Sequence, residues 1–587
     1  MKEDIEQLLL QSVSALQADG TLPEDIAPKI MVTRTKDPSH GDFACNIAMM
    51  LAKPAGMNPR ELAGKIVAAL PANNAIDKTD IAGPGFINFF LTADSTSSII
   101  PQILEMGERF GHSDIGKGEK IQLEFVSANP TGPIHVGHGR GAAYGATVAS
   151  LMRASGYEVD CEYYVNDAGR QMHILATSIW IRYLQENGLE LPFPSNGYKS
   201  EDYIYDIALE LKAAHRDSLV HDTDALMSDI PADEPDGGDK EEHIDALIDR
   251  ARALLGDDGY RTVFDAGLES ILGGICEDLA DFGVEFQTWY SEQSLADRGL
   301  IDKAVAQLTD AGYTYEKEGA LWFRSTDFGD EKDRVIIRDN GQGTYFASDI
   351  AYHLDKFDRG YDRAINIWGA DHHGYIPRVK AALKALGRDE DKLDILMVQF
   401  AILYRGGEMV QMSTRSGSFV TLSELREEIG NDAARFFYVM RKCEQHMDFD
   451  LDLAKSQSNE NPVYYIQYAH ARVCSVLGQL GDKGYEYDAA LGNQHLDLLT
   501  EKHETDLITA ITAFPETIAR AATQAEPHSV VHYLRDLANQ FHTYYNAHQF
   551  IVEDAALRNA RLNLISAVRT VINNGLHLLG VSAPESM

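Results

Sequence analysis

Cysteine is scarce in this chain, and no two cysteines form a CxxC pair. The five are widely spaced, at Cys45, Cys161, Cys276, Cys443 and Cys474. This spacing argues against a disulfide framework and against a zinc ribbon, so we expect no structural metal. Long apolar runs are missing too, since none approaches the roughly 20 residues that span a bilayer, and the N-terminus is acidic rather than signal-like. We therefore expect a cytoplasmic protein with no membrane partner.

Basic residues are outnumbered in this chain. Lys and Arg total 52 against 90 Asp and Glu, a net charge of −38, which taken alone argues against a nucleic-acid partner because like charges repel at long range. The average hides local differences. Residues 216–258 hold fourteen acidic and four basic side chains, whereas residues 359–388 hold six basic and two acidic ones. The composition is therefore compatible with local positive surface.

The length of 587 residues and the apolar fraction of 44% predict a globular protein of several domains. A small α+β module is expected over residues 1–111, with a helix over 41–53. An α/β unit is expected over 112–421, with an acidic insertion near 190–260. From 422 to 587 apolar residues keep mostly helical spacing, which predicts an all-α bundle.

A strand, a turn, a helix and a second strand follow one another within the α/β unit. Residues 121–125 alternate apolar and polar, NPTGP interrupts the pattern, a helix-like stretch follows, and residues 158–165 resume a strand pattern. Such a βαβ unit implies a parallel, Rossmann-like sheet whose ligand site lies at the C-terminal ends of the strands. Further strand-like runs at 363–368 and 395–403 come after a long helical stretch, so we expect an insertion to split the sheet.

Glycines crowd the start of the helix that follows NPTGP. Each one destabilises a helix interior by ~1 kcal/mol relative to Ala, so their number favours a site where a flat base or ribose lies on the helix start and phosphates face its N-terminus. His135 and His138 lie on the same side of that turn and could donate hydrogen bonds to phosphate oxygens. The alternative is tight packing of the helix on the sheet, with two surface histidines. The glycines are Gly137, Gly139, Gly141 and Gly145.

The segment EFVSANPTGPIHVGHGRGAA (124–143) resembles the HIGH signature of class I aminoacyl-tRNA synthetases, in the form found in bacterial arginyl-tRNA synthetases. The likeness continues in order through YYVNDAGRQM, WGADHHGY, MSTRSGSFVTL, NPVYYIQYAHARVCS and the C-terminal LLGVSAPESM, and so covers nearly the whole chain. It implies a tRNA-contacting domain at 1–111, a Rossmann-like catalytic domain at 112–421 and an anticodon-binding helical domain at 422–587.

The resemblance implies ATP-dependent activation of L-arginine and its transfer to the 3′-terminal adenosine of tRNA(Arg), with release of AMP and pyrophosphate. ATP is expected as its Mg²⁺ complex, and the enzyme as a monomer. Such chemistry needs mainly positioning and charge stabilisation, so no covalent nucleophile is required. Two other functions are compatible with parts of the sequence: a nucleotidyltransferase of the same HxGH superfamily, and a non-catalytic RNA-binding paralogue.

The resemblance assigns the ATP site to residues in three separate blocks. Asp371 falls at the end of a predicted strand, where a carboxylate suits ribose hydroxyls, although it could instead cap the following helix. The expected ATP-binding residues are His135, Gly137, His138, Gly369, Asp371, His372, Met412 and Ser413.

The second class I signature departs from the family pattern. Where most members have Lys-Met-Ser-Lys-Ser, this chain has QMSTRS (411–416). Some members that lack the loop lysine carry a lysine shortly before the first signature, but the matching position here is Gly132. We expect Arg415 to take over, as a catalytic residue beside His135 and His138, because a guanidinium can clamp two phosphate oxygens. The alternatives are a loop that contacts no ligand, or a role for Arg140 or Arg405.

Recognition of arginine requires anions arranged around a planar guanidinium. Tyr345 and Asp349 lie four residues apart, on one face if the segment is helical. By resemblance these two contact the guanidinium, while Glu124, Ser127, Asn129 and His135 surround the rest of the substrate. The alternative for Asp349 is a solvated acid on an amphipathic helix.

Candidate tRNA contacts lie in the two outer domains. Phe86 could stack on a splayed base and Asn88 could bind its edge, although Phe86 is equally compatible with a core position. Tyr464, Tyr468 and Arg472 recur at every fourth position, a stripe that is more often packing than readout.

Overall fold

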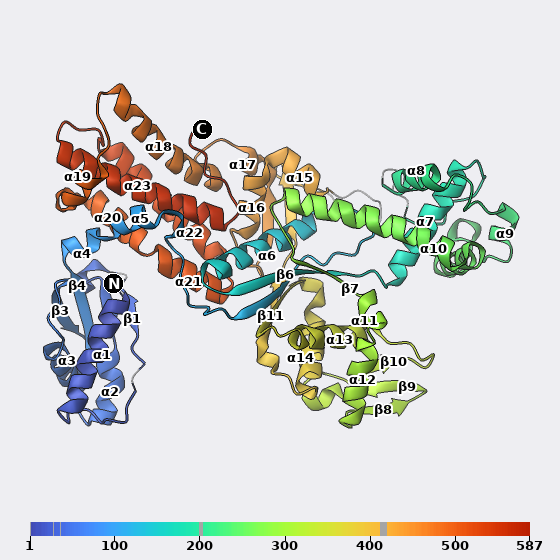
Figure 1. The fold of residues 1–587 in the computed structure, drawn as a ribbon, viewed down its shortest axis with the longest axis horizontal. Coiled ribbons are helices and arrows are strands. Elements are labelled where there is room, and N and C mark those ends of the chain that lie inside the picture. Colours follow the sequence, from blue (N-terminus) through green and yellow to red (C-terminus); the bar gives the residue numbers. More distant parts are fainter. Residues whose placement is uncertain (1, 28, 36, 199–202, 411–419) are drawn as a thin grey trace.

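The computed structural model describes residues 2–27, 29–35, 37–198, 203–410 and 420–587. Three parts follow one another along the chain: an N-terminal module, a central α/β domain with a projecting helical lobe, and a C-terminal helical bundle. In space the N-terminal module lies beside the bundle at one end of the molecule, and the lobe projects at the other end (Figure 1). The expected fold class is confirmed. Within the described ranges, no helix combines the length and the apolar character needed to cross a bilayer.

The central domain is built on a five-stranded parallel sheet of order β12-β11-β5-β6-β7. Its strands are β5 (Lys120–Glu124), β6 (Glu158–Val165), β7 (Thr288–Ser291), β11 (Arg363–Gly369) and β12 (Leu393–Val398). The chain runs outward from β5 through β6 to β7 on one side of the boundary between β5 and β11, and then returns to form β11 and β12 on the other side. In open α/β sheets, ligands bind at the strand C-terminal ends beside such a switch point.

Two helices place side chains at that point. Helix α6 (Val136–Ala154) follows β5, and helix α13 (Tyr345–Asp358) precedes β11. Between β6 and β7 the chain leaves the sheet to form the projecting lobe (Figure 1). The lobe contains α7 (Arg170–Glu186), α8 (Tyr203–His215), α9 (Thr223–Met227) and α10 (Lys240–Asp281).

Three predicted elements differ from the structure. The run at 395–403 is two strands, because β12 ends at Val398 and β13 (Ala401–Arg405) pairs with β14 (Glu408–Met409) and β15 (Met447–Asp450) in a separate sheet. Strand β15 also interrupts the helical region expected from residue 422. The segment 41–53 divides into β2 (Phe43–Cys45) and α2 (Ile47–Ala55) rather than forming one helix.

The N-terminal module has a hydrophobic core of its own. Its antiparallel sheet has the order β1-β2-β4-β3 and is packed against helices (Figure 1). The other elements of the module are α1 (Lys2–Ala18), β1 (Val32–Arg34), α3 (Pro59–Ala68), β3 (Ile76–Ala82) and β4 (Phe86–Leu91).

The C-terminal helices pack on the catalytic domain as well as on one another, because one continuous core runs through both. The buried Arg435 guanidinium joins them: its Nε donates to the Leu579 carbonyl at 3.2 Å and its Nη1 to the Phe282 carbonyl at 2.9 Å. The helices are α16 (Asn431–Val439), α18 (Pro462–Asp482), α20 (Lys502–Thr512), α21 (Phe514–Gln524), α22 (His528–Ala547) and α23 (Ala555–Leu578).

Candidate active site

A cavity of about 450 Å³ lies at the C-terminal ends of β5 and β11. It brings together residues from the predicted site segments at 124–143, 345–349 and 369–372. Ten of the predicted site residues line it: Glu124, Ser127, Asn129, Gly137, His138, Tyr345, Asp349, Gly369, Asp371 and His372.

The signature histidines meet at the N-terminus of α6. His135 is the N-cap, and its Nδ1 accepts a hydrogen bond from the Gly137 N–H at 3.1 Å, which places the ring proton on Nε2. The rings of His135 and His138 stack with centroids 3.9 Å apart. Burial, together with the neighbouring His135, lowers the pKa of His138 to about 3, and burial also lowers the pKa of His135. Both rings are therefore neutral at pH 7, and each has one N–H to donate.

The glycines of α6 serve two different needs. A Cβ on Gly145 would meet the Phe125 ring at 2.3 Å, and one on Gly139 would meet Tyr438 at 2.9 Å, so packing requires these two. A Cβ on Gly137 would meet the His135 ring at 2.8 Å. Gly141 has no neighbouring atom within 4 Å and faces the cavity, so it is the position where bare backbone is open to a ligand.

The loop after β5 is held in a strained conformation. Val126 and Ser127 have φ of 68° and 42°, and left-handed backbone is rare for a β-branched residue such as Val126. The Ser127 hydroxyl fixes the loop: it donates to Glu124 Oε1 at 3.1 Å and accepts from the Tyr164 N–H at 3.1 Å. Asn129 is oriented from the other side, where its Oδ1 accepts from Asn166 Nδ2 at 3.1 Å.

Glu124 and Asp349 line the part of the cavity next to α13, and the buried Glu292 lies close enough to act on Asp349. Burial, together with Glu292 and Glu124, raises the pKa of Asp349 to about 8. Burial and the nearby Asp167 raise the pKa of Glu292 to about 7. An acid that is held protonated in this way marks a place where a cation would bind with a large gain.

Sequence reasoning missed Glu292. The side chain is 6% exposed, and its Oε2 has no hydrogen-bond partner among the described residues. It follows β7, a strand of only four residues whose pattern is too short to be recognised. Glu292 could have been predicted only from knowing that β7 pairs with β6 in parallel. The C-terminal ends of parallel strands lie at the same edge of the sheet, which would place Glu292 at the edge where the site lies.

A buried chain of hydrogen bonds runs from Glu124 on β5 to the backbone of α13. Lys356 is fully buried, and its Nζ donates to Glu124 Oε2 at 2.6 Å and to Asn366 Oδ1 at 2.7 Å. Asn366 Nδ2 donates to His353 Nε2 at 2.8 Å, and His353 Nδ1 donates to the Asp349 carbonyl at 2.8 Å. Lys356 was not predicted as a site residue, because a lysine on a helix is usually solvated. These hydrogen bonds hold the Glu124 side chain against the α13 backbone at Asp349.

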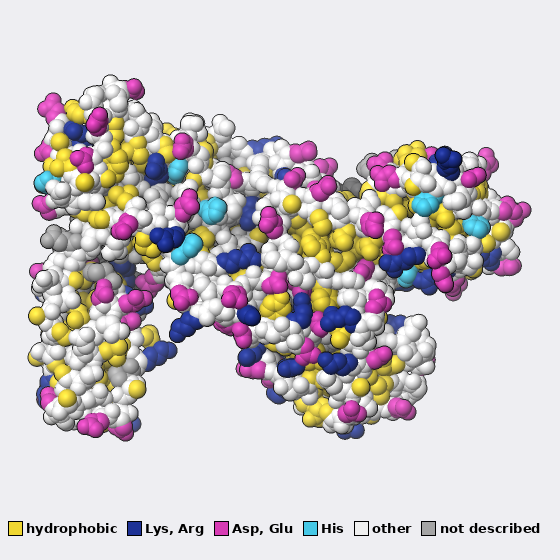
Figure 2. Space-filling model, in the orientation of Figure 1, with side chains coloured by type: hydrophobic (Ala, Val, Ile, Leu, Met, Phe, Trp, Pro, Cys, Tyr) yellow, Lys and Arg dark blue, Asp and Glu magenta, His cyan; other side chains and the backbone are white. Residues whose placement is uncertain are grey.

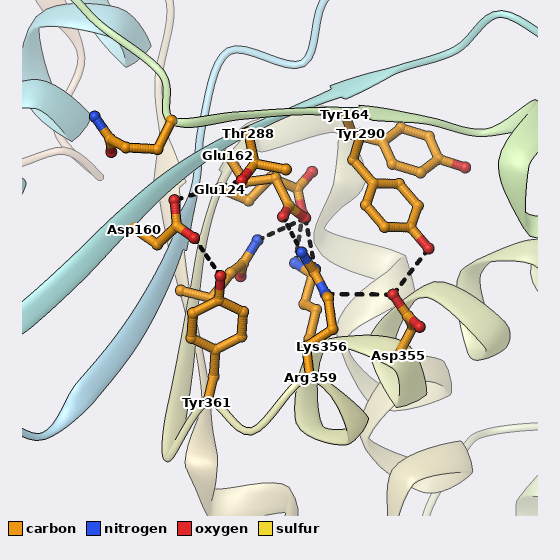
Figure 3. A network of polar contacts seen from close by, with 12 residues as sticks. Glu124, Asp160, Glu162, Tyr164, Thr288, Tyr290, Asp355, Lys356, Arg359 and Tyr361 are labelled. Atoms are coloured by element: carbon orange, nitrogen blue, oxygen red, sulfur yellow. Dashed lines mark hydrogen bonds and ion pairs between the residues drawn. The ribbon is translucent and has the colours of Figure 1, made fainter.

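Figure 3 shows Lys356 and Arg359 extending from α13 toward Glu124 and Glu162, which lie on neighbouring strands. Arg359 Nη2 donates to Glu162 Oε1 at 2.9 Å, and the Tyr352 hydroxyl donates to the same oxygen at 2.6 Å. These contacts bind α13 to the sheet, so the position of Asp349 is set by two buried ion pairs.

Asp371 and His372 lie on the opposite side of the cavity, after β11. Both are well exposed, and Asp371 Oδ2 lies 3.5 Å from His372 Nε2. The N-cap of the following helix α14 (Ile376–Ala385) is Tyr375, without a side-chain cap, so Asp371 does not cap that helix. Its carboxylate remains available to a ligand in the cavity.

Arg415, the residue predicted to stabilise pyrophosphate, lies outside the described residues, as do the predicted ATP-binding residues Met412 and Ser413. The two alternatives are engaged elsewhere. Arg140 is buried and donates to the carbonyls of Gln399, Lys442 and Gln445 at 2.7–2.8 Å, and Arg405 pairs with Glu428 at 2.6 Å.

Three family models match the chain in order. The arginyl tRNA synthetase N terminal domain matches residues 3–91, the class I (R) tRNA synthetase catalytic domain matches 99–206 and 282–452, and the DALR anticodon binding domain matches 466–587. Proteins called arginine–tRNA ligase align over 100% of both chains, with 64% identity in Thioalkalivibrio sulfidiphilus and 58% in Legionella pneumophila. The chain belongs to the arginyl-tRNA synthetase family.

Solved structures share the fold of this arginyl-tRNA synthetase. That of Thermus thermophilus arginyl-tRNA synthetase has a TM-score of 0.74 at 22% identity and covers 100% of both chains. The Plasmodium falciparum enzyme has a TM-score of 0.70 at 15% identity and covers 100% of this chain and 99% of its own. The match to the catalytic family stops at residue 206 and resumes at 282, so it leaves out the acidic stretch at 216–258. The expected domain boundaries stay a prediction.

The predicted tRNA contacts of this synthetase differ in accessibility. Phe86 begins strand β4 and is 39% exposed, whereas Asn88 on the same strand is 3% exposed and does not present its amide at the surface. Tyr464 and Tyr468 stack on each other at 6.0 Å. The Arg472 guanidinium lies over the rings of Tyr468 and Tyr545, at 4.3 and 4.5 Å from their centroids. The predicted tRNA contacts Tyr464, Tyr468 and Arg472 therefore pack on one another and on a neighbouring helix.

Among the residues that the structure describes, no three His, Cys, Asp or Glu side chains converge as metal ligands would. Mg²⁺ commonly binds through one or two carboxylates together with substrate phosphates, which needs no such cluster. Asp371 is the exposed carboxylate on the side of the cavity assigned to ATP.

Proposed function

We propose that this cavity activates L-arginine with ATP and then transfers the arginyl group to tRNA(Arg). The observation that supports it best is the pair of acids, Asp349 and Glu292, whose raised pKa values mark an uncompensated site for a cation. A nucleotidyltransferase or a non-catalytic paralogue would have no use for this pair beside a nucleotide cavity.

The guanidinium of arginine is proposed to bind Asp349, with Tyr345 and Glu292 completing the contacts. Tyr345 is exposed and lies one helical turn from Asp349 on α13. A guanidinium supplies a fork of donors that lysine lacks, so such a pocket discriminates through geometry as well as charge. Glu124, Ser127 and Asn129 would orient the reacting end of the substrate.

ATP is proposed to lie across the start of α6, with its adenosine between Gly141 and the strand end at Gly369. Asp371 would bind ribose hydroxyls or, together with the phosphates, would coordinate Mg²⁺. The phosphates would face the N-terminus of α6, where free N–H groups favour anions and His135 and His138 donate from neutral rings. Gly137 leaves room at this point.

In the first step, a carboxylate oxygen of arginine attacks the α-phosphorus of ATP, the bond to the β-phosphate oxygen breaks, and pyrophosphate leaves. Donors aimed at the charge that develops on the phosphate oxygens stabilise this transition state. Arg415 is proposed to hold the leaving pyrophosphate, with Met412 and Ser413 beside the nucleotide. In the second step, a hydroxyl of the terminal adenosine attacks the arginyl carbonyl, and AMP leaves.

Exchange of labelled pyrophosphate into ATP tests the proposal. Wild type is expected to exchange with arginine and not with lysine, measured with and without tRNA(Arg). Asp349→Ala should abolish the exchange while ATP binding stays detectable by equilibrium dialysis. Asp371→Ala is the matched variant, which should weaken ATP binding more than arginine binding. Near-normal exchange in Asp349→Ala would remove the assignment, and exchange that ignores arginine would favour another function.

We also propose that the enzyme acts as a cytoplasmic monomer. Each activity above uses residues from a single chain, so no second copy is needed to complete the cavity. Sedimentation in the presence and absence of tRNA checks the oligomeric state.

A further inference from the structure

A buried lysine lies beside the candidate active site. Figure 2 shows Lys, Arg, Asp and Glu side chains spread over the visible face of the molecule, which is where charged groups are usually found. Lys356 on α13 departs from this pattern, because it is 0% exposed. Burying an ammonium group is unfavourable unless each of its donors has a partner. The partners of Lys356 therefore indicate what its burial achieves.

Three groups from different elements fix the ammonium group of Lys356. Its Nζ donates to Glu124 Oε2 on β5 at 2.6 Å and to Asn366 Oδ1 on β11 at 2.7 Å. The Nζ also lies 4.4 Å from the centroid of the Tyr352 ring, within the range of a cation–π contact. Burial lowers the pKa of Lys356, whereas Glu124 and Glu162 raise it, so the charge on the ammonium depends on these carboxylates. Lys356 acts on the cavity through the groups it touches.

Among these groups, Glu124 is the charged one that lines the cavity. Its two carboxylate oxygens are held separately, because Oε1 accepts from the Ser127 hydroxyl at 3.1 Å while Oε2 accepts from Lys356. A carboxylate held at both oxygens keeps one orientation, and each oxygen retains a lone pair for a further donor. Glu124 is therefore oriented before any substrate enters.

The three acids on the α13 side of the cavity differ in charge before a substrate binds. Asp349 and Glu292 form no ion pair with any residue in the described ranges, and pKa values of about 8 and about 7 mean that both hold protons to a large extent at pH 7. Glu124 forms an ion pair with the buried ammonium of Lys356. An adjacent ammonium stabilises the charged form of a carboxylate. Glu124 is therefore the preformed anion on this side of the cavity.

We propose that Lys356 is a positioning residue, which holds the Glu124 carboxylate in place to bind the α-ammonium group of the amino-acid substrate. The proposal rests on the function proposed above, which places arginine in this cavity. Glu124 lies on the side assigned to the reacting end of arginine, and the α-ammonium is the cation at that end. Lys356 thereby selects, through Glu124, for a substrate with a free amino group, while Asp349 selects for the guanidinium.

The test is calorimetric binding of three ligands to the full chain. Arginine carries both cationic ends, agmatine lacks the carboxylate and keeps the amine, and 5-guanidinopentanoate lacks the α-amino group. In Lys356→Met, which keeps the length of the side chain, arginine and agmatine should bind about 10- to 100-fold more weakly, the range typical of a hydrogen bond to a charged group. The affinity for 5-guanidinopentanoate should stay nearly unchanged, because this ligand has no ammonium for Glu124.

Arg359→Met is the matched control. Arg359 also joins α13 to a buried glutamate, with its Nη2 2.9 Å from Glu162 Oε1, but Glu162 is outside the lining of the cavity. A loosened α13 acts on Asp349, and each of the three ligands has a guanidinium. Arg359→Met should therefore weaken all three by a similar factor, which is the pattern expected of a purely structural role.

The double variant Glu124→Gln/Lys356→Met keeps the test informative if Lys356→Met alone proves unstable. It removes both charges of the pair, so no buried charge is left without a partner. The double variant should bind arginine no more weakly than Glu124→Gln alone, because Lys356 acts through Glu124. Thermal unfolding of each variant accompanies the binding measurements.

Unchanged arginine binding in Lys356→Met would overturn the proposal. Equal weakening of all three ligands would also overturn it, since Lys356 would then only support α13, and so would losses that add in the double variant. These outcomes differ from a failure of the proposed function. A wild-type enzyme that binds none of the three ligands would overturn the proposed function, and the role of Lys356 with it.

Discussion

The Asp349 carboxyl stays protonated at neutral pH in this structure, because burial and two neighbouring acids raise its pKa to about 8. Arginine binds the ionised form, so below pH 8 each molecule bound must displace a proton. We expect the affinity for arginine to rise with pH, by up to about tenfold per unit below pH 8, and to level off above it. Calorimetry between pH 6 and 9, in two buffers of different ionisation enthalpy, measures both affinity and proton release.

Asp349→Asn is the control for this pH dependence. It should bind arginine weakly, and with a flatter profile, because Glu292, with a pKa of about 7, is then the titrating group. A wild-type affinity that is constant from pH 6 to 9 would show that the acid is already ionised, and would contradict the proposed environment of Asp349.

At this scale the sequence predicts residues that belong to local motifs. The family resemblance assigned Tyr345 and Asp349 to the guanidinium, and their spacing of four residues placed them on one helical face. His135 and His138 were predicted because they share one turn at a glycine-rich helix start. Glu292 and Lys356 were not predicted, because each joins the site through a partner far away in the chain. Lys356 donates to Glu124, 232 residues earlier. No local pattern encodes such a pair.

Helix α6 carries glycines required by packing and one glycine, Gly141, that faces the cavity without packing against anything. Gly145→Ala should destabilise the enzyme, because the new Cβ would lie 2.3 Å from the Phe125 ring. Gly141→Ala meets no atom within 4 Å, so it should leave stability unchanged or raise it by up to about 1 kcal/mol through helix propensity. If adenosine lies there, the same variant should raise the KM for ATP several-fold. Denaturant unfolding and exchange kinetics on the two variants check both effects.

A Gly141→Ala enzyme with normal KM for ATP would mean that the nucleotide does not lie against α6 at this position. A stable Gly145→Ala enzyme would show that the Phe125 ring can move away. The sequence indicated that the glycines are needed. It did not distinguish glycines needed for packing from a glycine needed for a ligand, because side chains such as Phe125 and Tyr438 approach α6 only in the folded chain.

Element boundaries were predicted where the local pattern changes and missed where it does not. Strand β6 spans the predicted 158–165, with a turn before it and a polar loop after it. The division between β12 and β13 was missed because the apolar run continues across it. The backbone changes partners there: the Gln399 N–H donates to the Cys443 carbonyl at 2.9 Å instead of to the parallel sheet.

We propose that the N-terminal module contacts tRNA through Phe86, far from the cavity, so a variant there should alter tRNA binding alone. Phe86→Ala should weaken tRNA binding by about 1–3 kcal/mol if the ring stacks on a base, with KM values for ATP and arginine unchanged. Phe89, on the same strand, is 0% exposed, and Phe89→Ala should instead destabilise the module by about 3–5 kcal/mol. Filter binding and thermal unfolding distinguish the two. If Phe86→Ala binds tRNA with wild-type affinity, the exposed Phe86 ring takes no part in tRNA binding.

Fold class and family were predictable for the whole molecule because signature blocks recur along its entire length. The net charge was misleading at the same scale. It averages the acid-rich stretch at 216–258 with stretches such as 359–388 that hold more basic than acidic residues.

The pairing of β5 with β11 sets the order in which the catalytic centre can be completed. Ile121 lies opposite Arg363 in that pairing, and the chain between them forms the whole projecting lobe and α13. Closing so long a loop is slow compared with forming local helices. During synthesis, the histidine turn therefore leaves the ribosome well before the strand that will become its neighbour, and the lobe has time to fold first.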